Sequence, residues 1–319
     1  MLRIENLVVE YPIGRGRVVH AVSDVSFDVR EGETLGIVGE SGCGKSTTAR
    51  AVIQLPPPNE GSVSYRGREL TTLKAEEMRR LRPALQIIFQ DPVSSLNPRR
   101  KIRSIVSEPL RVWGDKQRTA GRRSPDNVDR LLESVGLDPD ATGERRPSEL
   151  SGGQCQRVSI ARALMLDPDV IVCDEPVSAL DVSVQAQILN LLEDMKERYG
   201  LTLLFISHDL SVVRNISDRV LVMYLGKVCE MGNGDAVFEK PAHPYTRALL
   251  AAIPDPAPCV DVSEADLKGE LPSPIDPPAG CRFHTRCPQA QERCRVEEPA
   301  VRPIGDDHYI ACHFPILKE

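Results

Sequence analysis

Apolar and polar positions alternate along the first thirty residues with the two-residue period of a half-buried strand. Such alternation predicts strands that place one face on a core, and two of them in succession indicate an antiparallel sheet. The two apolar sets are Leu7, Val9 and Tyr11, followed by Val25, Phe27 and Val29.

Further along, the apolar residues form short unbroken runs at Leu35–Val38, Val170–Cys173 and Leu203–Ile206. Runs of this length predict strands buried on both faces, as in a parallel sheet. A helical pattern around Gln185–Tyr199 separates the last two runs, and Arg219–Cys229 is typical of a hairpin. The order of elements therefore predicts an α/β fold.

A helix is expected from Lys45 to about Leu55, where Pro56-Pro57-Pro58 would end it because proline cannot continue a helix. Residues 71–147 are polar, rich in arginine and helical in pattern, with no clear strand. We expect them to form most of an inserted helical subdomain at about 71–165.

Charge and hydropathy argue against a nucleic-acid-binding protein and against a protein with a membrane span or a signal peptide. A net charge of −6 over 319 residues argues against nucleic-acid binding through bulk positive charge. No apolar run approaches the ~20 residues that span a bilayer, and residues 1–5 lack a signal-peptide pattern. We expect a cytosolic protein whose membrane attachment comes through a partner.

The run from Gly39 to Ser46 matches the phosphate-binding P-loop, G-x-x-x-x-G-K-[ST]. Its glycines let backbone N–H groups surround the phosphates of a nucleotide, and the helix that follows points its positive end at them. Lys45 would reach the β- and γ-phosphates, and Ser46 would ligate Mg²⁺. The candidate phosphate-contacting residues are Gly39, Ser41, Gly42, Cys43, Gly44, Lys45, Ser46 and Thr47.

Two further segments carry acidic and capping patterns. The apolar run at 170–173 delivers Asp174 to the carboxyl end of a strand, where it would bind Mg²⁺, and Glu175 would polarise the attacking water. Ser151-x-x-Gln154 is a capping-box pattern whose intervening Gly152 and Gly153 expose N–H groups at a helix start.

Together, the P-loop and Leu150-Ser151-Gly152-Gly153-Gln154 resemble the nucleotide-binding domain of an ABC ATPase over roughly residues 1–235. The resemblance implies that the 151–154 segment contacts ATP held by a second subunit, so that two ATP molecules lie between head-to-tail subunits. Cys155 departs from many relatives, which carry a basic residue there. The resemblance also implies roles for His208 at the γ-phosphate, Gln90 at Mg²⁺ and water, Asp181 in the D-loop and Tyr11 against adenine.

Three features narrow the resemblance to ATP-binding subunits of bacterial oligopeptide/dipeptide importers. They are the segment Ile88–Arg99, the presence of a cysteine, Cys43, within the P-loop, and the segment His243–Leu250. The resemblance implies two ATPase subunits, two membrane permeases and an external substrate-binding protein, with this chain on the cytoplasmic face of the membrane. Some such importers move nickel or another solute. Rival interpretations are a soluble ABC ATPase of DNA repair or translation and an exporter ATPase.

Four cysteines crowd the last forty residues, after a proline-rich stretch over 254–280 that suggests a linker. We expect an ATPase domain over 1–238 and a C-terminal extension over 239–319. In a reducing compartment such a cluster favours metal over disulfides. The spacing leaves open an iron–sulfur cluster, zinc or free thiols, with His284, His308 and His313 as substitute ligands. The importer resemblance implies a 4Fe–4S cluster on Cys281, Cys287, Cys294 and Cys312.

Overall fold

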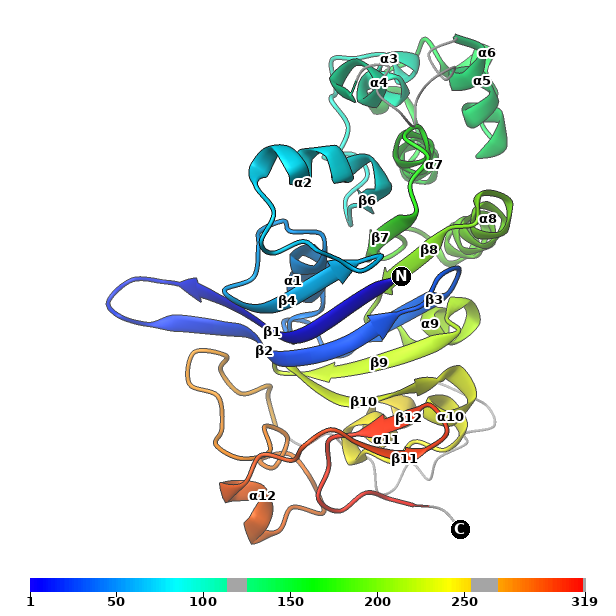
Figure 1. The fold of residues 1–319 in the computed structure, drawn as a ribbon. Coiled ribbons are helices and arrows are strands. Elements are labelled where there is room, and N and C mark those ends of the chain that lie inside the picture. The colour runs from blue at the N-terminus through cyan, green and yellow to red at the C-terminus, as the bar shows by residue number, and fades with distance from the viewer. Residues whose placement is uncertain (114–124, 254–268, 318–319) are drawn as a thin grey trace. The chain divides into compact units, whose positions relative to one another are not determined.

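In the computed structural model the chain forms two compact units. The first, which we call the P-loop unit, combines Met1–Thr72 with Phe205–Glu319; the second, the helical unit, is Leu73–Leu204. The proline-rich stretch over 254–280 lies partly outside the residues that the structure describes. Figure 1 shows the elements along the chain. The described residues are 1–113, 125–253 and 269–317.

The first sheet of the P-loop unit has the order β2-β1-β4-β5, and its pairs are antiparallel. Opposite residues of the first pair, such as Leu2 with Val29 and Ile4 with Phe27, are buried on one face. The predicted antiparallel pair is thus confirmed. The strands are β1 (Leu2–Pro12), β2 (Val18–Val29), β4 (Glu60–Tyr65) and β5 (Arg68–Glu69).

The second sheet of this unit has the order β11-β12-β10-β9-β3. Its parallel pair, β3 and β9, is buried at every residue, as expected for strands covered on both faces. The hairpin turn places Leu225 and Gly226 at φ 45° and 76°, the left-handed region that a tight two-residue turn requires. The strands are β3 (Thr34–Val38), β9 (Arg219–Tyr224), β10 (Lys227–Asn233), β11 (Arg302–Gly305) and β12 (His308–Ile310).

The first helix of the unit ends earlier than the sequence predicted. Gln54 takes a left-handed φ of 59°, its N–H donates to Ala51 O, and the Leu55 N–H donates to Arg50 O at 2.8 Å. This pair of bonds is a Schellman motif, so the backbone closes the helix before the prolines are reached. The helices of the unit are α1 (Lys45–Val52), α9 (Leu210–Ile216), α10 (Gly234–Glu239), α11 (Pro244–Ala251) and α12 (Glu292–Val296).

The helical unit contains a strand that the sequence analysis did not expect. Residues Leu85–Ile88 form β6, parallel to β7 (Val170–Asp174), so the reading of 71–147 as free of strands is wrong. β8 (Thr202–Ile206) follows in the order β8-β7-β6 and ends in the P-loop unit. The helices are α2 (Ala75–Leu81), η1 (Arg82–Ala84), α3 (Ile102–Val106), α4 (Glu108–Trp113), α5 (Pro125–Ser134), α6 (Pro139–Thr142), η2 (Pro147–Glu149), α7 (Gly152–Leu164) and α8 (Val182–Tyr199).

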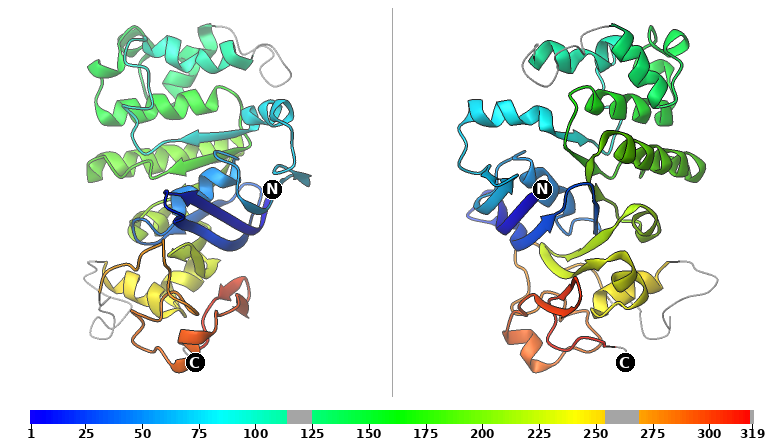
Figure 2. Two further views of the ribbon diagram at one scale, coloured as in Figure 1. Left: turned by 90° about the vertical axis from the view of Figure 1, so that its left-hand side faces the viewer. Right: turned by 45° about the vertical axis from the view of Figure 1, so that its right-hand side comes forward.

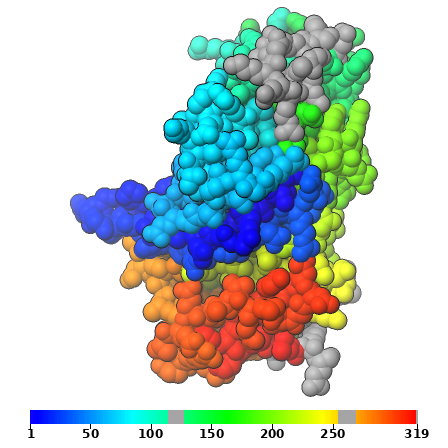
Figure 3. Space-filling model, in the orientation of Figure 1, coloured from blue at the N-terminus to red at the C-terminus, as the bar shows by residue number. Residues whose placement is uncertain are grey.

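The last residues of the P-loop unit pack against its first strands. Figure 3 shows the orange and red surface of these residues meeting the blue surface of β1 and β2, and both views of Figure 2 place the same segments together. The His20 N–H donates to Pro274 O at 2.9 Å, and Arg30 Nη2 lies 2.7 Å from Asp307 Oδ1. The predicted boundary at 238/239 falls inside this unit and stays a prediction.

A buried carboxylate joins the elements of this C-terminal part. Glu230, on β10, is fully buried. Its Oε1 accepts from the Ala242 N–H at 2.8 Å and lies 2.7 Å from His308 Nε2, and its Oε2 accepts from the His243 N–H at 3.0 Å. One side chain therefore fixes β12 and the start of α11.

His243 in turn caps α11, because its Nδ1 accepts from the Tyr245 N–H at 3.0 Å. Burial lowers the pKa of His243 to about 4. The ring is thus neutral at pH 7 and keeps the lone pair that the cap requires.

Replacing Glu230 with alanine should leave two N–H groups and an imidazole buried without their acceptor. We expect a loss of about 3 kcal/mol in the free energy of unfolding, measured by denaturant titration. Glu297→Ala is the matched control, because its i,i+4 pair with Arg293 is half exposed, and surface pairs of this kind contribute about 0.5 kcal/mol. Equal losses in the two variants would contradict the role of Glu230.

Candidate functional site

The P-loop follows β3 and packs so closely on neighbouring backbone that two of its positions admit only glycine. A Cβ on Gly39 would lie 2.2 Å from Met223 O, and one on Gly44 would lie 2.2 Å from Ala21 O. Both glycines also have positive φ, 151° and 103°. The loop conformation thus depends on β2 and β9 beneath it.

The lysine of the loop folds back into it. Lys45 is 4% exposed, and its Nζ donates to Gly39 O at 2.7 Å and to Glu40 O at 2.9 Å. Cys43 is buried, and burial raises the pKa of its thiol, so it packs as a neutral side chain. The remaining candidates sit in the exposed turn and the half-buried first turn of α1, namely Ser41, Gly42, Ser46 and Thr47.

Two other candidates belong to the P-loop unit. The Ser207 N–H donates to Ile37 O at 3.2 Å, which places the exposed His208 at the end of β3 where the loop begins. Tyr11 lies near the end of β1, is 38% exposed and pairs with Val19 of β2.

The helical unit brings two candidates into direct contact. Ile88 of β6 lies opposite Cys173 of β7, so Gln90 and Glu175 leave the sheet at the same end. Gln90 Nε2 donates to Glu175 Oε2 at 2.9 Å, although 85 positions separate the residues. The amide thus orients the carboxylate oxygen that the sequence analysis assigned to water activation.

The backbone around Glu175 is also specialised. Its φ of 48° is left-handed, and its carbonyl accepts from Ser178 through both the N–H (3.3 Å) and the hydroxyl (3.1 Å). A non-glycine residue in this conformation is strained, and such strain is typical of functional positions. Asp174, at the end of β7, is 1% exposed, and Asp181 caps α8 through its backbone carbonyl.

The predicted capping box at α7 is present. Ser151 Oγ accepts from the Gln154 N–H at 3.3 Å, and Gln154 Oε1 accepts from the Ser151 N–H at 2.9 Å. A Cβ on Gly153 would lie 2.6 Å from Val184 Cγ1, so this glycine allows α7 to approach α8. Cys155 is fully buried, which separates it from the exposed start of the helix.

The four C-terminal thiols line one small cavity of the P-loop unit, together with His284 and His313. Among the described residues, no group of three or more His, Cys, Asp or Glu side chains is arranged as a formed metal site. His308 is engaged by Glu230 instead. Burial raises the pKa of Cys287 to about 11 and of Cys312 to about 12, so these thiols are protonated as they stand.

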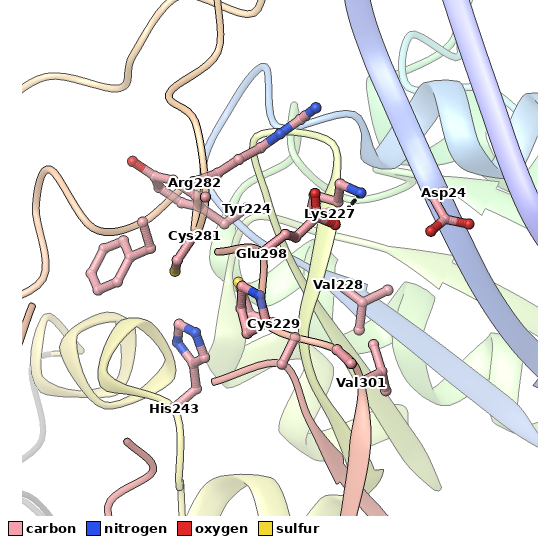
Figure 4. Close-up of a pocket in the computed structure, with 15 residues that line it drawn as sticks. Asp24, Tyr224, Lys227, Val228, Cys229, His243, Cys281, Arg282, Glu298 and Val301 are labelled. Carbon is pink, nitrogen blue, oxygen red and sulfur yellow. Dashed lines mark hydrogen bonds and ion pairs between the residues drawn. The ribbon is translucent and has the colours of Figure 1, made fainter. Parts of the chain in front are cut away.

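A second pocket adjoins these residues, and Figure 4 shows its lining. It includes Cys281 and Arg282 on one side and the β9–β10 hairpin on the other. Arg282 donates from Nη1 to Leu225 O, at the hairpin turn, and from Nη2 to Ser23 Oγ at 2.9 Å.

Two residues that were not predicted from the sequence contact the P-loop. Tyr245 Oη accepts from the Glu40 N–H at 2.9 Å, and Arg286 forms a bidentate ion pair with the Glu40 carboxylate. No local pattern identifies them, although Arg286 directly precedes a cysteine of the cluster.

Two family models match the chain. The model described as ABC transporter matches residues 22–178, and the model described as oligopeptide/dipeptide transporter, C-terminal region, matches residues 229–294. In the part of the chain that the structure describes, we find no helix with the length and apolar character needed to cross a bilayer.

Several curated proteins are similar over nearly the full length. The putative oligopeptide transport ATP-binding protein YkfD of Bacillus subtilis is 50% identical, over 98% of this chain and 95% of its own. The oligopeptide transport ATP-binding protein OppF of Salmonella typhimurium is also 50% identical, over the same shares. Matches over 98% of the chain span both family regions.

The fold is similar to that of solved ATP-binding cassettes. A dimeric structure of the cassette MJ0796, in a post-hydrolysis state with ADP and Pi, superposes with a TM-score of 0.66 and 29% identity, covering 73% of this chain and 98% of that one. The similarity supports the predicted α/β fold of a P-loop ABC ATPase. With its P-loop, the helix α7 that starts at Ser151 and these full-length relatives, the chain belongs to the ATP-binding proteins of ABC transporters, in the group that carries the oligopeptide/dipeptide transporter C-terminal region.

Proposed function

We propose that this chain is the ATP-hydrolysing subunit that drives oligopeptide or dipeptide import through a membrane ABC transporter. The observation that carries the proposal is one chain with both an ATPase body and the C-terminal region of oligopeptide/dipeptide transporters. Relatives named as oligopeptide transport ATP-binding proteins support the peptide as cargo. Import of nickel or another solute by the same machinery is the alternative.

ATP would be bound by the P-loop, with Lys45 neutralising the β- and γ-phosphates and Tyr11 against the adenine. Mg²⁺ would be held by Ser46, Asp174 and Gln90, whose hydroxyl, carboxylate and amide oxygens are the ligands that this ion prefers. The burial of Asp174 supports such a role, because a buried carboxylate gains from a cation.

Hydrolysis would depend on positioning rather than on covalent chemistry. Glu175 would accept a hydrogen bond from the attacking water and orient it towards the γ-phosphate. Gln90 Nε2 donates to that carboxylate at 2.9 Å and orients it. His208 would stabilise the charge that develops on the transferred phosphoryl group.

The residues that start α7 would act on the ATP of a second subunit. Ser151, Gly152, Gly153 and Gln154 start α7 with exposed or half-buried groups, and a helix start attracts phosphate. Two such subunits would enclose two ATP molecules head to tail, and Asp181 would lie at their contact. The dimeric structure of the cassette MJ0796 with ADP and Pi supports this arrangement.

The complete transporter would contain a second ATPase subunit, two permeases and an external substrate-binding protein. This chain would attach to the cytoplasmic face of the membrane through the permeases, with Gln90 and the residues that follow it as the docking segment. The negative net charge supports the absence of a nucleic-acid partner.

The cysteine module, which we define as residues 281–312, would hold a 4Fe–4S cluster through Cys281, Cys287, Cys294 and Cys312. The cavity that these four thiols share supports the assignment, since the donor set matches the thiolates that such clusters require. The four side chains would bind the cluster as thiolates, so the protons that burial retains on Cys287 and Cys312 at neutral pH, by raising their pKa, would be released to solvent on binding. The contribution of the cluster would be to hold together a module with little apolar core; zinc is the alternative.

Replacing Glu175 with glutamine should retain ATP binding and abolish turnover. The amide keeps the size of the side chain but does not orient water, so kcat in the reconstituted transporter should fall at least ~100-fold, with ATP-driven peptide uptake lost. Glu193→Gln, at an exposed site on α8, is the control. Near-normal hydrolysis in Glu175→Gln would remove Glu175 from its role, and uptake of nickel in place of peptide by the unaltered transporter would favour the alternative cargo.

Ser151→Arg should block the partner's γ-phosphate by its bulk. ATP affinity of the isolated chain should stay within about twofold, while hydrolysis by the assembled dimer is lost. Ser151→Ala removes the cap without adding bulk and should cost only about 1 kcal/mol of stability. Loss of ATP binding by the isolated Ser151→Arg chain would contradict action on a second subunit.

Protein purified without oxygen should be brown and contain about four irons per chain, measured by absorbance and metal analysis. Cys287→Ser should lose the iron, whereas Cys155→Ser, at a buried site of the helical unit, should retain it. A colourless preparation with one tightly bound zinc per chain would show that the module holds zinc and not a cluster. Four alkylatable thiols without metal would exclude both.

A further inference from the structure

One residue of the P-loop is held at two points by the C-terminal part of its own unit. The Glu40 carboxylate receives Arg286 Nη1 at 2.6 Å and Nη2 at 3.0 Å. The Glu40 N–H donates to Tyr245 Oη at 2.9 Å. Both the backbone and the side chain of Glu40 are therefore fixed by residues more than 200 positions away.

The ion pair is sheltered from water. The Arg286 side chain is 5% exposed and that of Glu40 is 28% exposed. The bond to Glu40 raises the pKa of Arg286 above its usual value, so the guanidinium is charged. A bidentate pair in such a site fixes direction as well as distance, in contrast to an exposed pair.

Arg286 and Tyr245, which together hold Glu40, are called the clamp, and an aromatic cluster fixes it on the side away from the P-loop. Tyr245 is fully buried and meets Tyr224 edge-on, with ring centroids 4.8 Å apart, while Phe283 lies 5.3 Å from Tyr245. Phe283 and Arg286 share one turn, since the Arg286 N–H donates to Phe283 O at 3.0 Å. Figure 4 shows Tyr224 beside Cys281 and Arg282 of the cysteine module.

The same P-loop residue also orients the lysine. The Glu40 carbonyl accepts from Lys45 Nζ at 2.9 Å. If the Glu40 carbonyl moves, the ammonium group of Lys45 loses or shifts one of its acceptors. Displacements of about 1 Å in a group that positions a substrate are costly for binding and catalysis. Neither Arg286 nor Tyr245 is itself among the candidate ATP contacts.

We propose that Arg286 is a positioning residue for ATP binding, which acts through Glu40 on Lys45 and makes the P-loop depend on the cysteine module. The inference rests on the proposed function only in taking the P-loop as the ATP site. Because Arg286 directly precedes Cys287, a rearrangement of the module would displace the clamp, and a correctly formed module would hold the P-loop in its binding conformation.

The test is ATP affinity of the full-length chain, measured by equilibrium binding, together with KM and kcat of the assembled transporter. Arg286→Met should raise the Kd and KM for ATP about tenfold and leave kcat within about twofold, because the residue positions the P-loop without touching the reacting groups. Arg286→Lys keeps the charge but loses the bidentate geometry, and it should raise Kd by about threefold.

Two comparisons separate positioning from general loss of structure. Glu40→Gln should raise Kd by a similar factor, and the double variant should be no worse than Arg286→Met, since both act through one contact. Arg293→Met is the control: its pair with Glu297 lies in the same module at a half-exposed site, and Kd should not change.

An unchanged Kd in folded Arg286→Met or Arg286→Lys would overturn the inference, as would additive effects in the double variant. A fall in kcat with KM unchanged would assign Arg286 a different role and would also overturn it. If the unaltered chain failed to bind ATP, the proposed function would fail instead, so the two outcomes are distinguishable.

Discussion

The P-loop depends on how closely it packs against the backbone of β2 and β9. Carbonyl oxygens of Ala21 and Met223 occupy the positions where side chains of Gly44 and Gly39 would begin. The Gly226 N–H also donates to Cys43 O at 2.8 Å. Since the support is backbone, no side-chain rearrangement can relieve a larger residue in the loop. The placement of Lys45 and the start of α1 follow from this contact.

Much of the fold could be predicted because its signals are local. Strand alternation, buried runs and the capping box at Ser151 each lie within a few residues, and the structure contains them. β6 was missed because its apolar core is only Leu85–Ile88 within a polar, arginine-rich surrounding, and its parallel partner β7 lies far along the chain. The end of α1 was misplaced because a backbone motif at Gln54 preceded the prolines.

The candidate site, like the fold, contains some features that local sequence signals predict and others that they do not. Gln90 and Glu175 were each named from a sequence motif, and they meet because each follows one of two neighbouring parallel strands. Their contact could not be predicted without β6, which the sequence did not reveal. The pair of Glu40 with Arg286 has no such signal, because 246 positions separate the two residues and neither the P-loop motif nor the cysteine spacing specifies what these two side chains contact. The shared cavity of the four thiols lies between these cases, since clustering in sequence predicted proximity but not burial.

Charged side chains, as well as apolar ones, join the C-terminal residues to the rest of the P-loop unit. Arg219 is 3% exposed and lies within 3.2–3.4 Å of carboxylates of Asp28, Glu33 and Asp307. Buried groups of this kind are costly when one partner is missing.

At about 5–20 residues per second, the ribosome needs roughly 12–50 s to add the 246 residues between Glu40 and Arg286. During that interval the nascent chain carries a P-loop that Arg286 does not yet hold, so under the proposed role of Arg286 the full affinity for nucleotide is reached only after this residue has been added.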